Sequence, residues 1–291
     1  MSLTKYCRSL TVCFVLGGVS LAPLALCAQN DGTDGPPKVL VIQREFTKPG
    51  KGGAQHEKTE AAYIHAMAAA GAKPRYLAMV SLSGQSRALF FSGYPSLAAW
   101  EEENKSVDQD ASLSAALDRA NVADGELLSE TNSSVWVRRD DLSLSSGNLL
   151  GVRFMEIRQF FIRPGHSREW DELVKMVIAG YKGVPEMNWT TFELQYGAVG
   201  HGFLVITRLK SMADADQMLG EDKEFAEALG EEGLKKLAAL ESSCIETEQD
   251  NLFQISPKMS YPPEAWVKAE PDFWKPKPVA AVKKAENKPA Q

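Results

Sequence analysis

The sequence predicts an α+β protein made of two successive units, each with the element order β-α-β-β-α-β. Two observations support this fold class: a motif that recurs at a constant offset, and hydrophobic periodicities that change from strand-like to helix-like in the same order in both halves. Residues 39–50 align with residues 154–165 at an offset of 115, and the same offset relates Leu89 to Leu204. A shared strand, turn and later strand at one spacing indicate an internal duplication.

Each unit begins with a strand rich in β-branched and aromatic residues, at 39–47 and 154–162, and both strands end at a Lys/Arg-Pro-Gly turn. A helix follows, clearest in the second unit, where Trp170, Leu173 and Val177 recur at the spacing of one buried helix face. The remaining predicted elements are paired strands at 75–82 with 87–94 and at 189–196 with 202–209, helices at 96–103, 112–119, 211–219 and 221–240, and final strands at 134–138 and 251–255.

These elements divide the chain into five parts. The predicted parts are a leader at 1–28, a first unit at 36–139, a polar, Ser-rich linker at 140–149, a second unit at 150–260, and a Pro/Lys/Ala-rich tail at 261–291. The tail is expected to be largely disordered because its composition buries little apolar surface. Trp266, Phe273 and Trp274 are the exceptions, and we expect them to dock its first part onto the body; binding of a partner is the alternative.

The leader has the pattern of a cleaved signal peptide. Lys5 and Arg8 precede an uncharged apolar run at 10–27, and cleavage after Ala28 satisfies the small-residue preference at the cut site. An uncleaved membrane anchor is the first alternative, since about 20 apolar residues span a bilayer, and a lipoprotein anchored through Cys27 is the second. The favoured interpretation is a secreted or periplasmic protein with no transmembrane span after removal of the signal.

Composition excludes several classes of site and partner. Three of the four cysteines lie in the leader, so Cys244 is the only thiol of the mature chain, which excludes an intrachain disulfide and a thiolate metal cluster. The net charge is −6, and no basic strip interleaved with aromatic residues is present. We therefore expect no nucleic-acid partner.

The element order, the Lys/Arg-Pro-Gly turns and the junction from Ser96 to Trp100 resemble the dimeric α/β barrel superfamily, which includes the antibiotic biosynthesis monooxygenase-like domains. The resemblance implies two tandem ferredoxin-like units packed face to face as a pseudo-dimeric α/β barrel. This superfamily contains monooxygenases, haem-degrading enzymes and members without known activity, so the fold constrains function weakly. Trp100 matches one of three residues of the haem-degrading pattern, and its His and Asn partners are missing, so that chemistry is not carried over.

The first helix of the first unit predicts a polar pocket. His56, Glu60 and Tyr63 lie on its sheet-facing stripe, Arg44 is in phase with inward residues of the first strand, and Trp100 is placed to close one wall. Buried polar groups need partners, so this stripe indicates a ligand pocket between helix and sheet. The alternative is that His56 and Glu60 are solvated at the start of the helix. No His pair has the spacing of a helical metal site, and no metal is predicted.

Three functions remain open from the sequence. The first is an exported small-ligand-binding protein of the cell envelope, with a small apolar or aromatic ligand in this pocket. The second is a cofactor-independent monooxygenase-like enzyme in which His56 acts as the base and Trp100 holds a flat substrate. The third is a structural or stress-related envelope protein that makes its contacts through the tail. No cofactor is predicted, haem and flavin stay open, and the sequence decides neither catalysis nor oligomeric state.

Overall fold

The computed structural model describes residues 35–144, 147–184, 187–218 and 222–275. The predicted signal peptide at 1–28 and the last part of the tail lie outside these residues. Among the helices in the described ranges, none has the length and apolarity needed to cross a membrane.

The described chain contains eight strands and eight helices, and the elements up to β8 follow one another in the predicted order. The last two helices lie in the segment expected to be a largely disordered tail, because the aromatic residues at its start pack against the barrel. The strands are β1 (Val39–Thr47), β2 (Leu77–Ser81), β3 (Arg87–Tyr94), β4 (Leu128–Leu144), β5 (Phe154–Ile162), β6 (Trp189–Tyr196), β7 (His201–Leu209) and β8 (Ile245–Ile255). The helices are α1 (Ala54–Ala69), α2 (Leu97–Gln109), α3 (Ala111–Gly125), α4 (Ser167–Tyr181), α5 (Met212–Met218), α6 (Asp222–Cys244, kinked at Gly230), α7 (Glu264–Ala269) and α8 (Pro271–Trp274).

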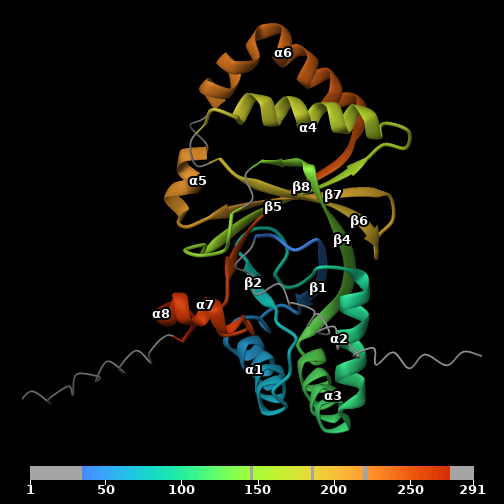
Figure 1. Cartoon of the computed structure of the whole chain (residues 1–291), viewed down its shortest axis with the longest axis vertical. Helices are drawn as coiled ribbons and strands as arrows, with labels where there is room; N and C mark the ends of the chain where they lie inside the picture. Colours follow the sequence, from blue (N-terminus) through green and yellow to red (C-terminus); the bar gives the residue numbers. More distant parts are fainter. Residues whose placement is uncertain (1–34, 145–146, 185–186, 219–221, 276–291) are drawn as a thin grey trace, which may run out of the picture.

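All eight strands form one closed antiparallel barrel in the order β1-β3-β2-β8-β5-β7-β6-β4. The helices lie outside it, with α4 and α6 on one side and α1, α2 and α3 on the opposite side (Figure 1). The fold is therefore α+β, and its sheet is covered by helices on the outside and filled by side chains on the inside.

The two halves of the barrel are joined edge to edge. β2 pairs with β8, as in Val80 opposite Gln254, and β4 pairs with β6, as in Val137 opposite Glu193. The predicted face-to-face packing therefore applies only to the inner faces of the two sheets, whose side chains pack against each other inside the barrel. The sheets are not two separate layers, because hydrogen bonds join them at two junctions, β2 with β8 and β4 with β6. We call these junctions the seams, and they leave no free strand edge in the described barrel.

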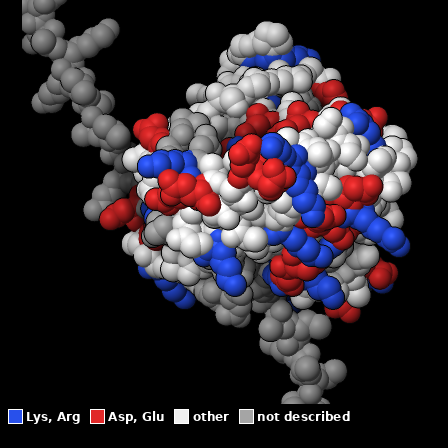
Figure 2. Space-filling model, turned by 90° about the horizontal axis from the view of Figure 1, so that it is seen from above, with Lys and Arg blue, Asp and Glu red and all other residues white. Residues whose placement is uncertain are grey.

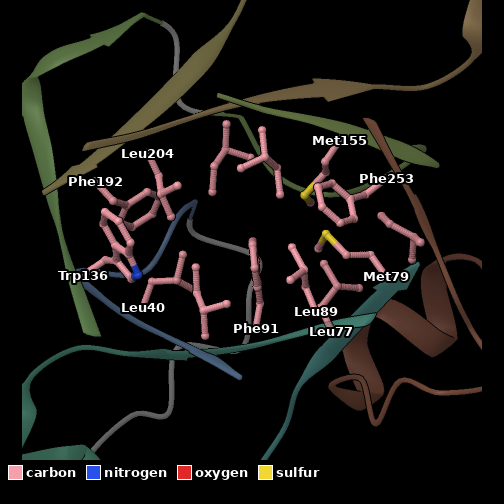
Figure 3. Packing of buried hydrophobic residues seen from close by; sticks show 14 of the residues in the cluster. Leu40, Leu77, Met79, Leu89, Phe91, Trp136, Met155, Phe192, Leu204 and Phe253 are labelled. Atoms are coloured by element: carbon pink, nitrogen blue, oxygen red, sulfur yellow. The ribbon is translucent and has the colours of Figure 1, made fainter. Parts of the chain in front are cut away.

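The barrel interior is a single apolar core to which strands of both halves contribute (Figure 3). Trp136, with 0% of its surface exposed, is among its largest members, and its indole Nε1 donates to Ser134 Oγ at 2.7 Å. The residues labelled in the figure are Leu40, Leu77, Met79, Leu89, Phe91, Trp136, Met155, Phe192, Leu204 and Phe253.

The last strand of each half is longer than the sequence predicts. β4 extends through the first part of the expected linker to Leu144, with Leu142 completely buried, and β8 begins at Ile245 rather than at 251. Both extensions are mostly polar, so they lack the alternation that marks a strand. Their backbones pair with β1, β6 and β5, which makes strand the preferred conformation despite the polar side chains.

One glycine marks the β4–β6 seam. Gly197 has a φ of +98°, and a Cβ there would overlap the carbonyl oxygen of Ser133 and lie 2.7 Å from Ser134 Cα. Gly165 has a similar φ of +90° but open space around it. Gly165→Ala therefore isolates the cost of the backbone conformation, whereas Gly197→Ala adds a clash at the seam.

We expect Gly165→Ala to lower the free energy of unfolding by about 1 kcal/mol, the cost of a left-handed conformation for an L-residue. Gly197→Ala should cost about 2–4 kcal/mol, because main-chain atoms of β4 must also move. Urea unfolding of both variants measures the difference. Equal losses would mean that the β4–β6 seam tolerates a side chain at this position.

Candidate functional site

The predicted polar stripe of the first helix is buried. α1 is rich in alanine, and its two fully buried residues are His56 and Glu60, each 3% exposed. They lie one turn apart, so both face the sheet. The corresponding helix α4 instead buries large apolar residues, including Trp170. The two halves therefore differ in the chemistry of this helix–sheet contact.

Two acidic residues from other elements meet this stripe. The outward face of β1 contributes Glu45, and the end of α3 contributes Asp124, which is 1% exposed. His56 Nε2 lies 3.1 Å from Glu45 Oε2, 3.4 Å from Asp124 Oδ1 and 3.8 Å from Glu60 Oε1. The potential ligand atoms of these four residues all lie within 4.8 Å of one another. We call this group the His–carboxylate cluster.

Burial sets the protonation of the cluster. Burial, together with the charges of Glu45 and Asp124, raises the pKa of Glu60 to about 9. Burial also raises the pKa of Glu45, although the hydrogen bond to His56 acts in the opposite direction. Buried carboxylates without a cationic partner favour the neutral form, so burial in this cluster disfavours the charged form of Glu60.

Neighbouring side chains orient the cluster. Thr59 Oγ1 donates to Asp124 Oδ1 at 2.5 Å, which fixes that carboxylate from the α1 side. An imidazole with three carboxylates is a donor set that suits divalent metal ions. The sequence identified His56 and Glu60 but not Glu45 or Asp124. Glu45 could have been found from the alternation of β1, because it occupies the strand face opposite to that of Leu40 and Ile42. No local sequence pattern marks Asp124.

The structure does not bring the five predicted pocket residues together. Arg44 points into the barrel, where it donates to Ser134 Oγ at 2.6 Å and lies 6.0 Å from the Trp136 ring centroid. The reason is that the inward face of β1 borders the interior rather than the helices. Tyr63 reaches α3, with its hydroxyl 3.4 Å from Asn121 Oδ1. Trp100 is half-buried on α2, with its ring 6.4 Å from that of Tyr94.

A separate cavity lies at the barrel end where β1, β2, β5 and β6 begin. Its volume is about 140 Å³, and its walls are mainly apolar side chains from both halves and from α7. Leu149 and Trp266 line it outside the strands. None of the five predicted pocket residues is in its lining, which includes Leu40, Leu77, Phe91, Met155, Phe192 and Ile206.

The first part of the tail is docked beside this cavity. Trp266, Phe273 and Trp274 pack against the barrel core, as their aromatic character predicted. The Glu270 carboxylate accepts hydrogen bonds from the Gly151 backbone N–H at 3.0 Å and from Arg153 Nη2 at 2.5 Å. The hydrogen bond from Arg153, together with that from Gly151, holds the pKa of Glu270 below its usual range.

A larger groove of about 600 Å³ runs along the outer face of the second half. Trp170 and Trp189 contribute to its walls, but so do the charged side chains Glu156, Arg158 and Asp250. Glu156 and Asp250 pair with Arg158 at 3.1 Å each. The groove is therefore more polar than the barrel-end cavity and presents ion pairs to solvent.

The charged surface is mixed. Figure 2 shows basic and acidic side chains interspersed on the face seen from above, and ion pairs such as Lys236–Glu172 belong to the helices on this side. Over the described residues of this face there is no continuous basic area of the kind that binds a phosphate backbone.

No family model matches the sequence, and the search of curated proteins found no match. Among solved structures, the chain is similar to an anthrone oxidase-like protein, with 12% identity, a TM-score of 0.49, and coverage of 75% of this chain and 92% of that one. It is also similar to a protein from Fusobacterium nucleatum assigned as a monooxygenase, with 10% identity, a TM-score of 0.47, and coverage of 75% and 91%.

A third similar structure is a mutant chlorite dismutase from Candidatus Nitrospira defluvii in complex with cyanide. It shows 10% identity, a TM-score of 0.47, and coverage of 80% of this chain and 95% of that one. In the described residues, eight antiparallel strands close into a single barrel.

The contacts of Glu270 predict a pH-dependent docking of the tail. Because its pKa is lowered in the docked state, its contribution is complete above the ordinary glutamate pKa and is lost as pH falls through the lowered value. Glu270→Gln removes the charge at every pH. We expect amide hydrogen exchange in α7 to become faster at pH 7 in this variant, on the order of ten-fold.

Glu264→Gln is the matched control, because Glu264 is 79% exposed and pairs with Lys268 in its own helix. Exchange in α7 should be nearly unchanged in this control. Equal exchange in wild type and Glu270→Gln would show that the aromatic contacts alone hold the tail.

Proposed function

We propose that the protein is an exported small-molecule-binding protein whose ligand occupies the barrel-end cavity. The observation that carries this proposal is the apolar lining of that cavity, to which strands of both halves and α7 contribute. Ligand sites are typically concave and mainly apolar, with few polar groups. The cavity fits this description better than the groove with its ion pairs.

The size and chemistry of the cavity favour a small apolar or aromatic ligand. A cavity of about 150 Å³ lined by Leu, Ile and Phe stays dry and accepts benzene, and the volume here is about 140 Å³. Arg75 and Arg208 are also in the lining, but both are engaged within the protein. Arg75 donates to the Ala72 carbonyl and lies 4.3 Å from the Tyr261 ring centroid, and Arg208 contacts Thr190 Oγ1 at 3.2 Å. Shape and apolar contact therefore dominate recognition.

This proposal keeps the predicted ligand class and changes the predicted place. His56, the candidate base of the monooxygenase-like alternative, is 3% exposed, enclosed by carboxylates, and absent from the cavity lining. A substrate in the cavity would not touch it. The geometry therefore favours binding over base catalysis at His56.

Two further parts of the proposal concern origin and location. We propose that the halves are tandem ferredoxin-like units, supported by their matching strand orders β4-β1-β3-β2 and β8-β5-β7-β6 and by the constant sequence offset. We also propose export to the periplasm or outside the cell, supported by the signal-peptide pattern of residues 1–28.

Ligand binding is tested with indole as the probe. Leu149→Trp places a larger side chain at the cavity wall, so we expect the affinity for indole, measured by isothermal titration calorimetry, to fall at least about ten-fold because the space is filled. Leu150→Trp is the matched control, since the neighbouring side chain is 44% exposed. Binding to Leu149→Trp with wild-type affinity, or no binding to wild type, would contradict the proposed site.

Export is tested by expressing the whole chain and measuring the intact mass of the protein found outside the cytoplasm. The expected mass is that of a chain beginning at Gln29. A full-length mass in the membrane fraction would instead support the uncleaved anchor.

A further inference from the structure

The His–carboxylate cluster has more acceptors than donors. His56 Nε2 carries at most one proton, yet carboxylate oxygens of Glu45, Asp124 and Glu60 lie 3.1, 3.4 and 3.8 Å from it. A single N–H forms one good hydrogen bond, so at least two of the three oxygens lack a donor from the imidazole. Asp124 receives one from Thr59, which leaves Glu60 as the residue to explain.

Glu60 is the member of the cluster with an unpaired carboxylate oxygen. Its Oε1 is buried and has no hydrogen-bond partner, and the side chain is 4% exposed and directed at His56. Tyr76 lies within electrostatic reach of Glu60 and Glu45, and its buried hydroxyl also has no partner. Buried polar atoms in folded proteins are nearly always paired, and an exception calls for an explanation such as an ion.

We propose that Glu45, His56, Glu60 and Asp124 bind one divalent transition-metal ion of the Zn²⁺ or Mn²⁺ class. Four protein donors from β1, α1 and α3 surround the same small volume. An ion there gives the unpartnered Glu60 oxygen a ligand bond and compensates the three carboxylates together.

The distances fit an ion of this kind. Around a tetrahedral ion with bonds of about 2.1 Å, two ligand atoms are about 3.4 Å apart. The three separations from His56 Nε2, 3.1 to 3.8 Å, bracket that value. All ligand atoms lie within 4.8 Å of one another, so small side-chain rotations complete the coordination.

The donor types restrict the metal. Imidazole suits Zn²⁺ and Fe²⁺, carboxylate oxygens suit Mg²⁺, Ca²⁺ and Mn²⁺, and a mixed set favours ions that accept both. The hydrogen bond from Thr59 to Asp124 is an outer-shell contact that orients a ligand. Because all four donor residues are buried, the site is closed and its role is structural. The ion joins α1 and α3 to β1, where the second half uses apolar packing.

The test uses the mature chain after dialysis against EDTA, titrated separately with Zn²⁺ and Mn²⁺ by isothermal titration calorimetry. We expect one ion per chain for at least one of the two metals. At a free concentration 100-fold above Kd, the unfolding equilibrium constant should fall about 100-fold. Failure of both ions to bind below about 100 µM would overturn the proposal.

The decisive variant is Glu60→Gln, which keeps the size of the side chain and removes the carboxylate that would bind the ion. The metal-free variant should fold, because the change removes an unpaired buried carboxyl group, and circular dichroism checks this. Its metal affinity should fall at least about 100-fold. Asp124→Asn should lower the metal affinity in the same way. Wild-type metal affinity in either variant would refute the proposal.

Two controls separate this site from surface binding. Glu57→Gln changes an acid of the same helix that pairs with Lys258, and it should keep full affinity. A double variant with His166→Gln and His201→Gln removes the two half-buried His–Glu pairs near the surface and should also keep the ion. Loss of the single binding event in this double variant would assign the ion to the surface and refute the buried site.

Discussion

Hydrogen bonding across the two seams, β2 with β8 and β4 with β6, is the constraint on which the rest of the structure depends. It turns two four-stranded sheets into one barrel without a free edge, which removes the hazard of edge-to-edge association. It also gives the strands an inner face against the core and, where helices cover the barrel, an outer face buried against those helices. The core, the cavity and the His–carboxylate cluster all follow from this double burial.

The two halves use the outer face differently. In the second half, α4 and α6 cover the sheet with an apolar cluster that contains Trp170, Leu173 and Phe203. In the first half, α1 contributes alanines and a buried polar pair, and the partners of that pair come from β1 and α3. Apolar packing is tolerant of small shifts, whereas a buried polar cluster stabilises only one arrangement and demands full pairing. The first half therefore depends more strongly on how completely the polar groups of the cluster are paired.

The tail completes the barrel end. Trp266 lines the cavity and, with Phe273 and Trp274, packs against the core of the barrel. The Arg153–Glu270 contact fixes this segment beside the loop that follows β4, and the Arg153 guanidinium lies 3.8 Å from the Phe273 ring centroid. The wall of the cavity and the docked tail thereby share one aromatic residue, Trp266.

The sequence by itself determined the order of the elements, the Lys/Arg-Pro-Gly turns and the burial of His56 and Glu60, since each of these follows from local periodicity and turn chemistry. Tertiary structure decided the rest. Alternation divides a strand into two faces but does not say which face meets the helices, so Arg44 faces the core and Glu45 faces α1. Asp124 reaches the cluster, and apolar residues of both halves reach one cavity, only because the barrel closes and brings distant segments together.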